Sequence, residues 1–293
     1  MRKSMILAIA TVAIWGTNAT VIKIILTSIP TLQTLGLSGL CAFLFLLGVN
    51  LLNGNLKKMR EYGWKDYLKM AGLGFLGLFL YSALYYYGLD ELSAQMACII
   101  NYLWPIMLVM FSCLLLHEKL TLGKCAALLI SFLGVIILSL GGQSGNSGNF
   151  TGGVISCIIA AACYGLFSVL NKKADMDQNI TMMVIWLTVT VCSLVLGRLT
   201  EDWIVIKGSQ WIGLIYLGIF TDAIAYLMWA LALKDSEEAA IVSNIAYLTP
   251  ILSVIISAIV LKEKISRNSF IAFIMILLGI VLQKLEEFRR EKS

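Results

Sequence analysis

One acidic side chain lies in the middle of a long apolar stretch of this sequence. Asp222 is central in the segment 211–233, whose other residues are mostly apolar. A charged side chain at the centre of a bilayer costs about 2.5–3.5 kcal/mol on insertion scales, so a residue of this kind usually has a function. Asp222 could pair with a cationic or ammonium group of a substrate, or it could carry a coupling proton. A structural ion pair or a hydrogen bond between helices is the alternative.

Aromatic side chains recur in comparable apolar stretches. Tyr81 and Tyr85 are four residues apart, and Tyr226 and Trp229 are three apart, so each pair shares one face of a helix. A cavity lined by such rings suits an aromatic substrate, and it suits cations through the ring quadrupole. Packing alone is the alternative for each residue. The candidate aromatic residues are Trp15, Tyr81, Tyr102, Trp104, Tyr164, Tyr226, Trp229 and Tyr247.

Small polar residues and prolines complete the set of candidates. In lipid, buried amides and hydroxyls either join helices or face a cavity. The polar candidates are Thr17, Asn18, Asn101 and Asn244. Pro105 and Pro250 each fall about halfway along an apolar stretch, where proline removes a backbone donor and interrupts a helix. Broken helices in matching positions point to the binding site of a transporter.

Lys23 stands near the end of the first apolar stretch. We expect its long side chain to extend to the membrane surface and to leave its charge in water. The alternative is that Lys23 pairs with Asp222 or with a substrate carboxylate.

The sequence lacks the patterns that most membrane enzymes and pumps require. It has one histidine, no Gly-x-Ser-x-Gly segment and no Gly-x-x-x-x-Gly-Lys-Ser/Thr loop. Its 7 cysteines lie in apolar stretches without a Cys-x-x-Cys pair. We therefore expect no enzyme activity, no cofactor and no metal site. Transport would draw on a gradient or run downhill.

Composition indicates the elements that must position these residues. Hydrophobic residues make up 59% of the chain and charged residues only 13%, whereas soluble domains are about 25% charged. A spanning helix needs roughly 20 apolar residues. We predict an all-α integral membrane protein with ten transmembrane helices at residues 5–27, 32–53, 68–88, 94–116, 122–140, 151–170, 180–197, 211–233, 239–261 and 268–284.

Charge predicts how these spans are oriented. If the N-terminus is inside, the loops on that side carry most of the 22 lysines and arginines, which is the usual bias of cytoplasmic loops. Both termini are then cytoplasmic, and the expected location is the cell membrane. The net charge of +5 fits this cationic rim, so we expect the lipid bilayer as a partner and no nucleic acid.

The two halves of the sequence resemble each other. A shift of 145 positions aligns Tyr81 with Tyr226, and it aligns the segment 102–106 with 247–251, which keeps Pro105 in step with Pro250. Residues 1–145 and 146–293 would each hold five helices. Five is odd, so the second half would enter the membrane from the opposite side. Inverted repeats of this kind are typical of secondary transporters, which bind substrate between the halves.

The chain resembles the ten-helix, EamA-type branch of the drug/metabolite transporter superfamily. The resemblance rests on Trp15-Gly16, on the two proline-containing helices, and on the turns Glu118-Lys119 and Glu263-Lys264. It implies a central cavity lined mainly by the first, third, fourth, sixth, eighth and ninth helices, with alternating access. The segment Asn101-Tyr102-Leu103-Trp104-Pro105 is similar to one in YddG-like exporters of aromatic amino acids and methyl viologen.

The resemblance implies export of a small metabolite, namely an aromatic or hydrophobic amino acid, by a monomer or weak dimer. Asp222 has no counterpart in the YddG-like exporters, and this difference points to a substrate that differs from theirs. A proton-coupled exporter of organic cations that uses Asp222 is the second hypothesis. An intramembrane enzyme or a channel fits the sequence less well.

Overall fold

The computed structural model describes residues 2–115, 122–140, 148–174, 176–232 and 248–291, and these residues form helices and short connections without a strand. The predicted all-α class is therefore confirmed for this part of the chain. The elements in chain order are α1 (Arg2–Leu26), α2 (Thr31–Leu52), the 3-10 helix η1 (Asn55–Glu61), α3 (Trp64–Gly74), the π-helix η2 (Phe75–Leu80), α4 (Tyr81–Glu91), α5 (Ala94–Asn101), α6 (Trp104–Leu115), α7 (Leu122–Leu140), α8 (Phe150–Ala174), α9 (Gln178–Thr200), α10 (Gly208–Ile215), the π-helix η3 (Tyr216–Ile224), α11 (Ala225–Ala232), α13 (Leu248–Val260) and α14 (Arg267–Glu291).

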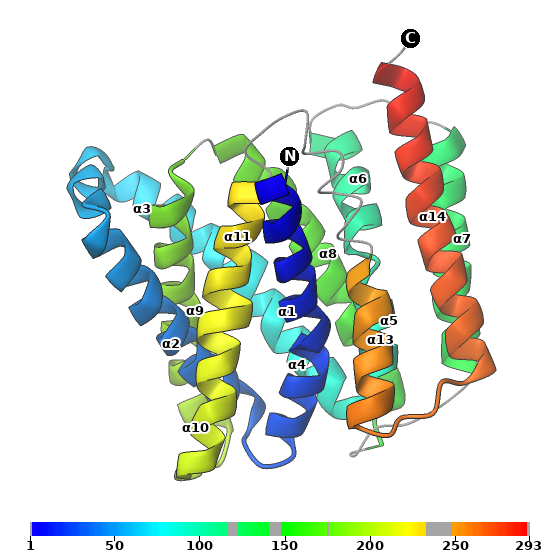
Figure 1. Cartoon of the computed structure of the whole chain (residues 1–293), viewed down its shortest axis with the longest axis horizontal. Helices are drawn as coiled ribbons and strands as arrows, with labels where there is room; N and C mark the ends of the chain where they lie inside the picture. The colour runs from blue at the N-terminus through cyan, green and yellow to red at the C-terminus, as the bar shows by residue number, and fades with distance from the viewer. Residues whose placement is uncertain (1, 116–121, 141–147, 175, 233–247, 292–293) are drawn as a thin grey trace.

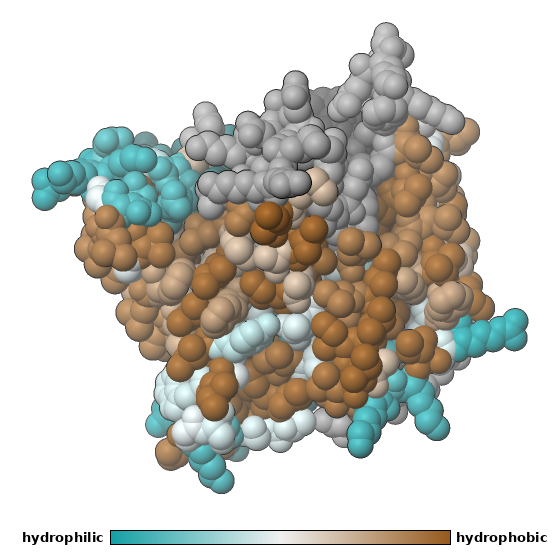
Figure 2. All heavy atoms as spheres, viewed as in Figure 1, coloured by the Kyte–Doolittle hydropathy of each residue, from teal (hydrophilic) through white to brown (hydrophobic). Residues whose placement is uncertain are grey.

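The helices form a bundle in which most of them run in roughly the same direction, upright in the view of Figure 1. Among the described residues, seven helical segments are long and apolar enough to cross a membrane, and two shorter apolar helices lie at 248–260 and 267–282. Hydrophilic residues gather at the two ends of the bundle, and apolar surface lies between them (Figure 2). The chain is thus a multi-pass membrane protein, while the count of ten spans remains a prediction.

The first and last helices share one end of the bundle. The N-terminal end of α1 and the C-terminal end of α14 both lie at the top of Figure 1. An even number of membrane crossings requires this arrangement. Which side of the membrane this end faces remains a prediction from the positions of lysine and arginine.

Two of the spans are continuous helices with a π-helical centre. Trp64–Glu91 consists of α3, η2 and α4, and Gly208–Trp229 contains η3 at its middle. The shift of 145 places residues 75–80 on 220–225, so the two π segments overlap in the aligned halves. A π-helical turn widens the helix and is often found at functional sites. This coincidence supports the repeat, while its inverted arrangement remains a prediction.

The predicted break at Pro105 lies where α5 ends and α6 begins. Helix α5 ends at Asn101, Tyr102 and Leu103 form a turn, and α6 begins at Trp104, which places Pro105 in the first turn of α6. Proline is tolerated in a first turn because the N–H it lacks would have no partner there. Pro250 likewise lies in the first turn of α13, whose preceding residues are outside the described part.

Carboxylates from distant loops cap two helix N-termini. Glu201 accepts hydrogen bonds from the backbone N–H groups of Leu32 (2.8 Å) and Gln33 (3.0 Å). Glu263 does the same for Ala94 (2.8 Å) and Gln95 (3.1 Å) at the start of α5. A negative group at a helix N-terminus satisfies free donors and the helix dipole together. A single glutamate from a distant loop thus helps to position each of α2 and α5. Glu118, which the shift of 145 aligns with Glu263, lies outside the described residues.

Lys23 does not extend to the membrane surface, so that expectation is wrong. Lys23 is 9% exposed, and its Nζ donates to the backbone carbonyls of Leu89, Asp90 (3.0 Å) and Leu92 (2.8 Å). These carbonyls lie at and just beyond the C-terminal end of α4, where the helix leaves acceptors without partners and favours a cation. Lys23 therefore ties α1 to the connection between α4 and α5.

Asp177 caps the N-terminus of α9, in a connection that the charge pattern predicts to be cytoplasmic. Its carboxylate accepts from the backbone N–H groups of Asn179 (3.0 Å) and Ile180 (3.4 Å) and from Lys58 Nζ (3.0 Å). Burial pushes the pKa of Asp177 upward, but the hydrogen bonds from Lys58, Ile180 and Asn179 outweigh it and hold the pKa below its usual value. A depressed pKa means that the stabilisation is present above the unfolded value of about 3.9 and fades as the pH falls through the folded pKa.

We expect Asp177→Ala to lower the free energy of unfolding by about 1 kcal/mol at pH 7, because the helix loses its N-terminal cap. The difference in stability between wild type and variant should shrink as the pH falls below about 4, because the wild-type carboxylate becomes protonated and no longer accepts these hydrogen bonds as an anion. Thermal unfolding in detergent, at pH 7 and again below about pH 4, measures the difference in stability between wild type and variant. The exposed Asp202 gives the matched control, since Asp202→Ala should change stability by less than about 0.5 kcal/mol. An equal loss of stability in neutral and in acidic solution would contradict this explanation.

Candidate functional site

A cavity lies inside the bundle where α1, α4, the α5–α6 break, α8, α9, η3, α11 and α13 converge. Its volume is about 100 Å³, measured as the space open to the centre of a water-sized sphere. A single water needs only about 10–15 Å³ on that measure, so the cavity has room for a small molecule. Its lining residues are Trp15, Asn18, Ala19, Tyr81, Ser82, Tyr85, Tyr86, Cys98, Asn101, Tyr102, Trp104, Tyr164, Trp186, Thr221, Asp222, Tyr226, Trp229, Thr249 and Ser253.

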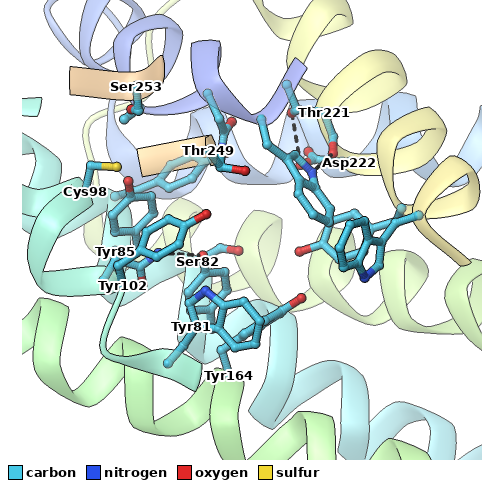
Figure 3. Close-up of a pocket in the computed structure, with 18 of the residues that line it drawn as sticks. Tyr81, Ser82, Tyr85, Cys98, Tyr102, Tyr164, Thr221, Asp222, Thr249 and Ser253 are labelled. Atoms are coloured by element: carbon cyan, nitrogen blue, oxygen red, sulfur yellow. Dashed lines mark hydrogen bonds between the residues drawn. The ribbon is translucent and has the colours of Figure 1, made fainter. Parts of the chain in front are cut away.

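Asp222 supplies the acidic group of this cavity. It is 8% exposed and sits in the π-helical η3, on the side of the cavity across from Tyr85 and Tyr102 (Figure 3). Its Oδ1 is 3.2 Å from the hydroxyl of Thr221, whose single proton also has Leu217 O as an acceptor at 2.6 Å. The Oδ2 atom is buried and has no hydrogen-bond partner in the part of the chain that the structure describes.

A buried carboxylate with so few donors is costly unless it gains a partner. No described residue that lines the cavity is Lys, Arg or His, so this part of the chain supplies no counter-ion there. Lys23 is committed to the backbone carbonyls of the α4–α5 connection. Two chemical states remain reasonable for Asp222: it holds a proton, or it is stabilised by a cation that enters the cavity.

Aromatic rings from both halves of the chain form the walls. The Trp15 ring lies 5.2 Å from Tyr226 and 5.6 Å from Trp229, as measured between centroids. On the other wall, Tyr164 lies 4.9 Å from Tyr81 and 5.1 Å from Trp104. Such contacts hold the rings in fixed positions and leave a largely apolar surface that can pack on a ring or on a cation.

Hydrogen bonds fix the positions of several lining groups. Trp15 Nε1 donates to the carbonyl of Thr221 at 3.2 Å, which joins α1 to η3 beside Asp222. Asn101 Nδ2 donates to the hydroxyl of Tyr81 at 3.1 Å, which joins the end of α5 to α4. The first of these bonds joins elements that are distant in sequence, and the second joins two successive helices.

Most of the residues that the sequence singled out lie around this one cavity. They are Trp15, Asn18, Tyr81, Asn101, Tyr102, Trp104, Tyr164, Asp222, Tyr226 and Trp229. Thr17 lies elsewhere, because its hydroxyl contacts the Tyr216 hydroxyl at 2.7 Å. Pro105 and Pro250 are buried beside the cavity without lining it. Asn244 and Tyr247 lie outside the described residues.

The sequence reasoning missed several lining residues. Thr249 could have been found, because the shift of 145 aligns it with Trp104, and Ser253 follows one helical turn later. Ser82 and Tyr86 could also have been found, because they are four residues apart in α4 and directly follow Tyr81 and Tyr85, which share a helix face in the same way. Trp186 gave no signal, because its position on the predicted seventh span suggested no role in a cavity.

Comparison with known proteins finds transporters along nearly the whole chain. The model of the EamA-like transporter family matches residues 2–140 and 151–283. The uncharacterized transporter YvbV of Bacillus subtilis (strain 168) is 28% identical over 278 residues, which cover 92% of this chain and 88% of that protein. An uncharacterized transporter of Archaeoglobus fulgidus is 28% identical, with 96% of this chain and 98% of that protein covered.

One similar protein has a substrate in its name. The aromatic amino acid exporter YddG of Ancylobacter novellus is 28% identical over 188 residues, which cover 63% of this chain and 64% of that protein. A solved crystal structure aligns over 100% of both chains with a TM-score of 0.69 at 22% sequence identity. At that identity the structural likeness concerns the fold alone. The names of the family and of these relatives indicate transport rather than catalysis.

Proposed function

Because the chain belongs to the EamA-like transporter family, we propose that it exports a small metabolite, foremost an aromatic or hydrophobic amino acid, across the cell membrane. The observation that carries this proposal is the buried cavity, whose walls are aromatic rings and whose acidic group is Asp222. A pocket with apolar walls and a few polar groups is the usual form of a small-molecule site. The similarity to an aromatic amino acid exporter supports the choice of substrate.

The proposed mechanism is alternating access between two five-helix halves, residues 1–145 and 146–293, in opposite orientations. The two family matches fall within these halves, and the cavity takes residues from both. Inverted halves can rock about a central site and expose it to one side at a time. The proposed orientation keeps both termini in the cytoplasm, and the protein acts as a monomer or weak dimer.

A second candidate is the proton-coupled export of organic cations. The unpaired Oδ2 of Asp222 favours it, because that atom can hold either a proton or a cation. Cations also bind to the faces of rings such as Trp15 and Tyr226, which lie beside Asp222 in the cavity.

Transport into proteoliposomes tests both candidates. Purified protein is reconstituted, and uptake of labelled phenylalanine and of methyl viologen is followed with and without a pH gradient. The first candidate is expected to give saturable phenylalanine counterflow that unlabelled tyrosine inhibits. The second is expected to give methyl viologen uptake only when a pH gradient is imposed. Liposomes without protein give the background, and uptake no faster than this background for both solutes would contradict the proposed function.

A further inference from the structure

The polar groups of the cavity that lack a partner are mostly hydrogen-bond acceptors. Three buried oxygens that line it have no hydrogen-bond partner among the described residues: Asn18 Oδ1, Asn101 Oδ1 and Asp222 Oδ2. Asp222 and Asn101 are only 8% and 7% exposed. A buried donor without a partner among the described residues, the indole N–H of Trp186, also lines the cavity.

Buried acceptors without donors are costly, so the group that best fills this cavity brings several N–H donors. An ammonium group carries three donors and a positive charge that Asp222 can neutralise. A quaternary ammonium carries the same charge but no N–H. It would leave the two amide oxygens unpaired, although the rings would still attract it.

The described lining of the cavity offers little to a carboxylate. The described lining residues include no Lys, Arg or His, and Asp222 would repel a second negative charge. The tyrosine hydroxyls and Trp186 can donate to an anionic oxygen, but they carry no charge to offset its desolvation. Lys23, which follows Ala19 by one turn of α1, is held by three backbone carbonyls.

We infer that the group this cavity recognises is a primary ammonium with free N–H donors, and that a substrate carboxylate weakens binding. The preferred ligands are then primary aralkyl amines and amino acid derivatives without a free carboxylate. This inference rests on the proposed function, because it concerns the same cavity. An amino acid carries the ammonium group that the cavity recognises, and its carboxylate makes it a weaker ligand than the corresponding amine or amide.

Binding of two matched ligand series tests the inference. Isothermal titration of the purified protein in detergent compares phenethylamine with its N-methyl, N,N-dimethyl and N,N,N-trimethyl derivatives. It also compares phenylalanine amide with phenylalanine, which differ in the carboxylate. We expect affinity to fall by roughly tenfold over the N-methyl series, and phenylalanine to bind at least roughly tenfold more weakly than its amide.

Variants of the amide groups link the preference to named atoms. Asn18→Leu and Asn101→Leu each remove one unpaired oxygen, so each should reduce the preference for phenethylamine over its trimethyl derivative by roughly threefold or more. Two variants are needed because Asn101 also holds Tyr81, and its loss could disturb folding. The exposed Asn53 at the end of α2 is the control, and Asn53→Leu should leave the preference unchanged.

Several results would overturn the inference. These are equal affinities along the methylation series, phenylalanine binding as tightly as its amide, or no binding by any of these ligands. The proposed function is judged separately by the proteoliposome assay. If phenylalanine counterflow is saturable but the binding affinities follow the reverse of the expected order, this inference is wrong and the proposed function still holds.

Discussion

Asp222→Asn is expected to lower the efficiency of transport of an amine-bearing substrate by about 10- to 150-fold. The reason is that a hydrogen bond to a charged group contributes about 1.5–3 kcal/mol, and the amide keeps the shape of the side chain but loses its charge. The site offers no replacement, because no other acid lines the cavity among the described residues. Initial rates of counterflow over a range of substrate concentrations measure the effect.

The same variant separates the two roles that Asp222 could have. Counterflow moves substrate in exchange for substrate and needs no net proton movement. Normal counterflow with loss of the response to a pH gradient would assign Asp222 to the proton, whereas loss of both would assign it to the substrate. Asp202→Asn is the matched control, because Asp202 is exposed and lies after the end of α9, outside the cavity. Unchanged transport in Asp222→Asn would remove this carboxylate from the mechanism.

Some features of the cavity follow from sequence because their signals are local or repeated. Asp222 is visible as a charge in an apolar stretch, and the broken helix at Pro105 follows from the missing N–H of proline. The alignment of Trp104 with Thr249 could have extended the set of lining residues further. Such signals survive because the membrane requires regular helices and makes each exception costly.

Other features depend on contacts that no local pattern contains. Lys23 looks like a residue that reaches the membrane surface, and only the neighbouring end of α4 gives its ammonium buried carbonyls to bind. Trp186 is 2% exposed, and its ring lies 6.5 Å from Tyr226 of α11. The packing of α9 on α2, α3 and η2 therefore decides the place of Trp186 at the cavity. Residues of this kind require the tertiary arrangement before they can be identified.

The position of Asp222 also depends on how closely η3 approaches α2, and Gly218 sets that distance. A Cβ atom at Gly218 would lie 2.2 Å from the backbone oxygen of Ser38 and 2.6 Å from the Cβ of Cys41. The backbone of α2 cannot rotate away as a side chain can, so the two helices must separate. Small residues allow helices to pack closely in membranes. Van der Waals contacts drive this packing, and no hydrophobic effect compensates when they are lost.

We therefore expect Gly218→Ala to lower the free energy of unfolding by about 3 kcal/mol, near the upper end for an overpacked site. Gly48→Ala in α2 is the control, because apart from its own stretch of α2 no described atom lies within 4 Å of the added Cβ. The change there should be neutral or stabilising by up to about 1 kcal/mol. Thermal unfolding in detergent compares the two variants. Since Asp222 follows Gly218 by one turn, the folded fraction of Gly218→Ala should also show weaker amine binding than Gly48→Ala. Equal stability of the two variants would mean that η3 and α2 are not in close contact, and the support for the placement of Asp222 would fall with it.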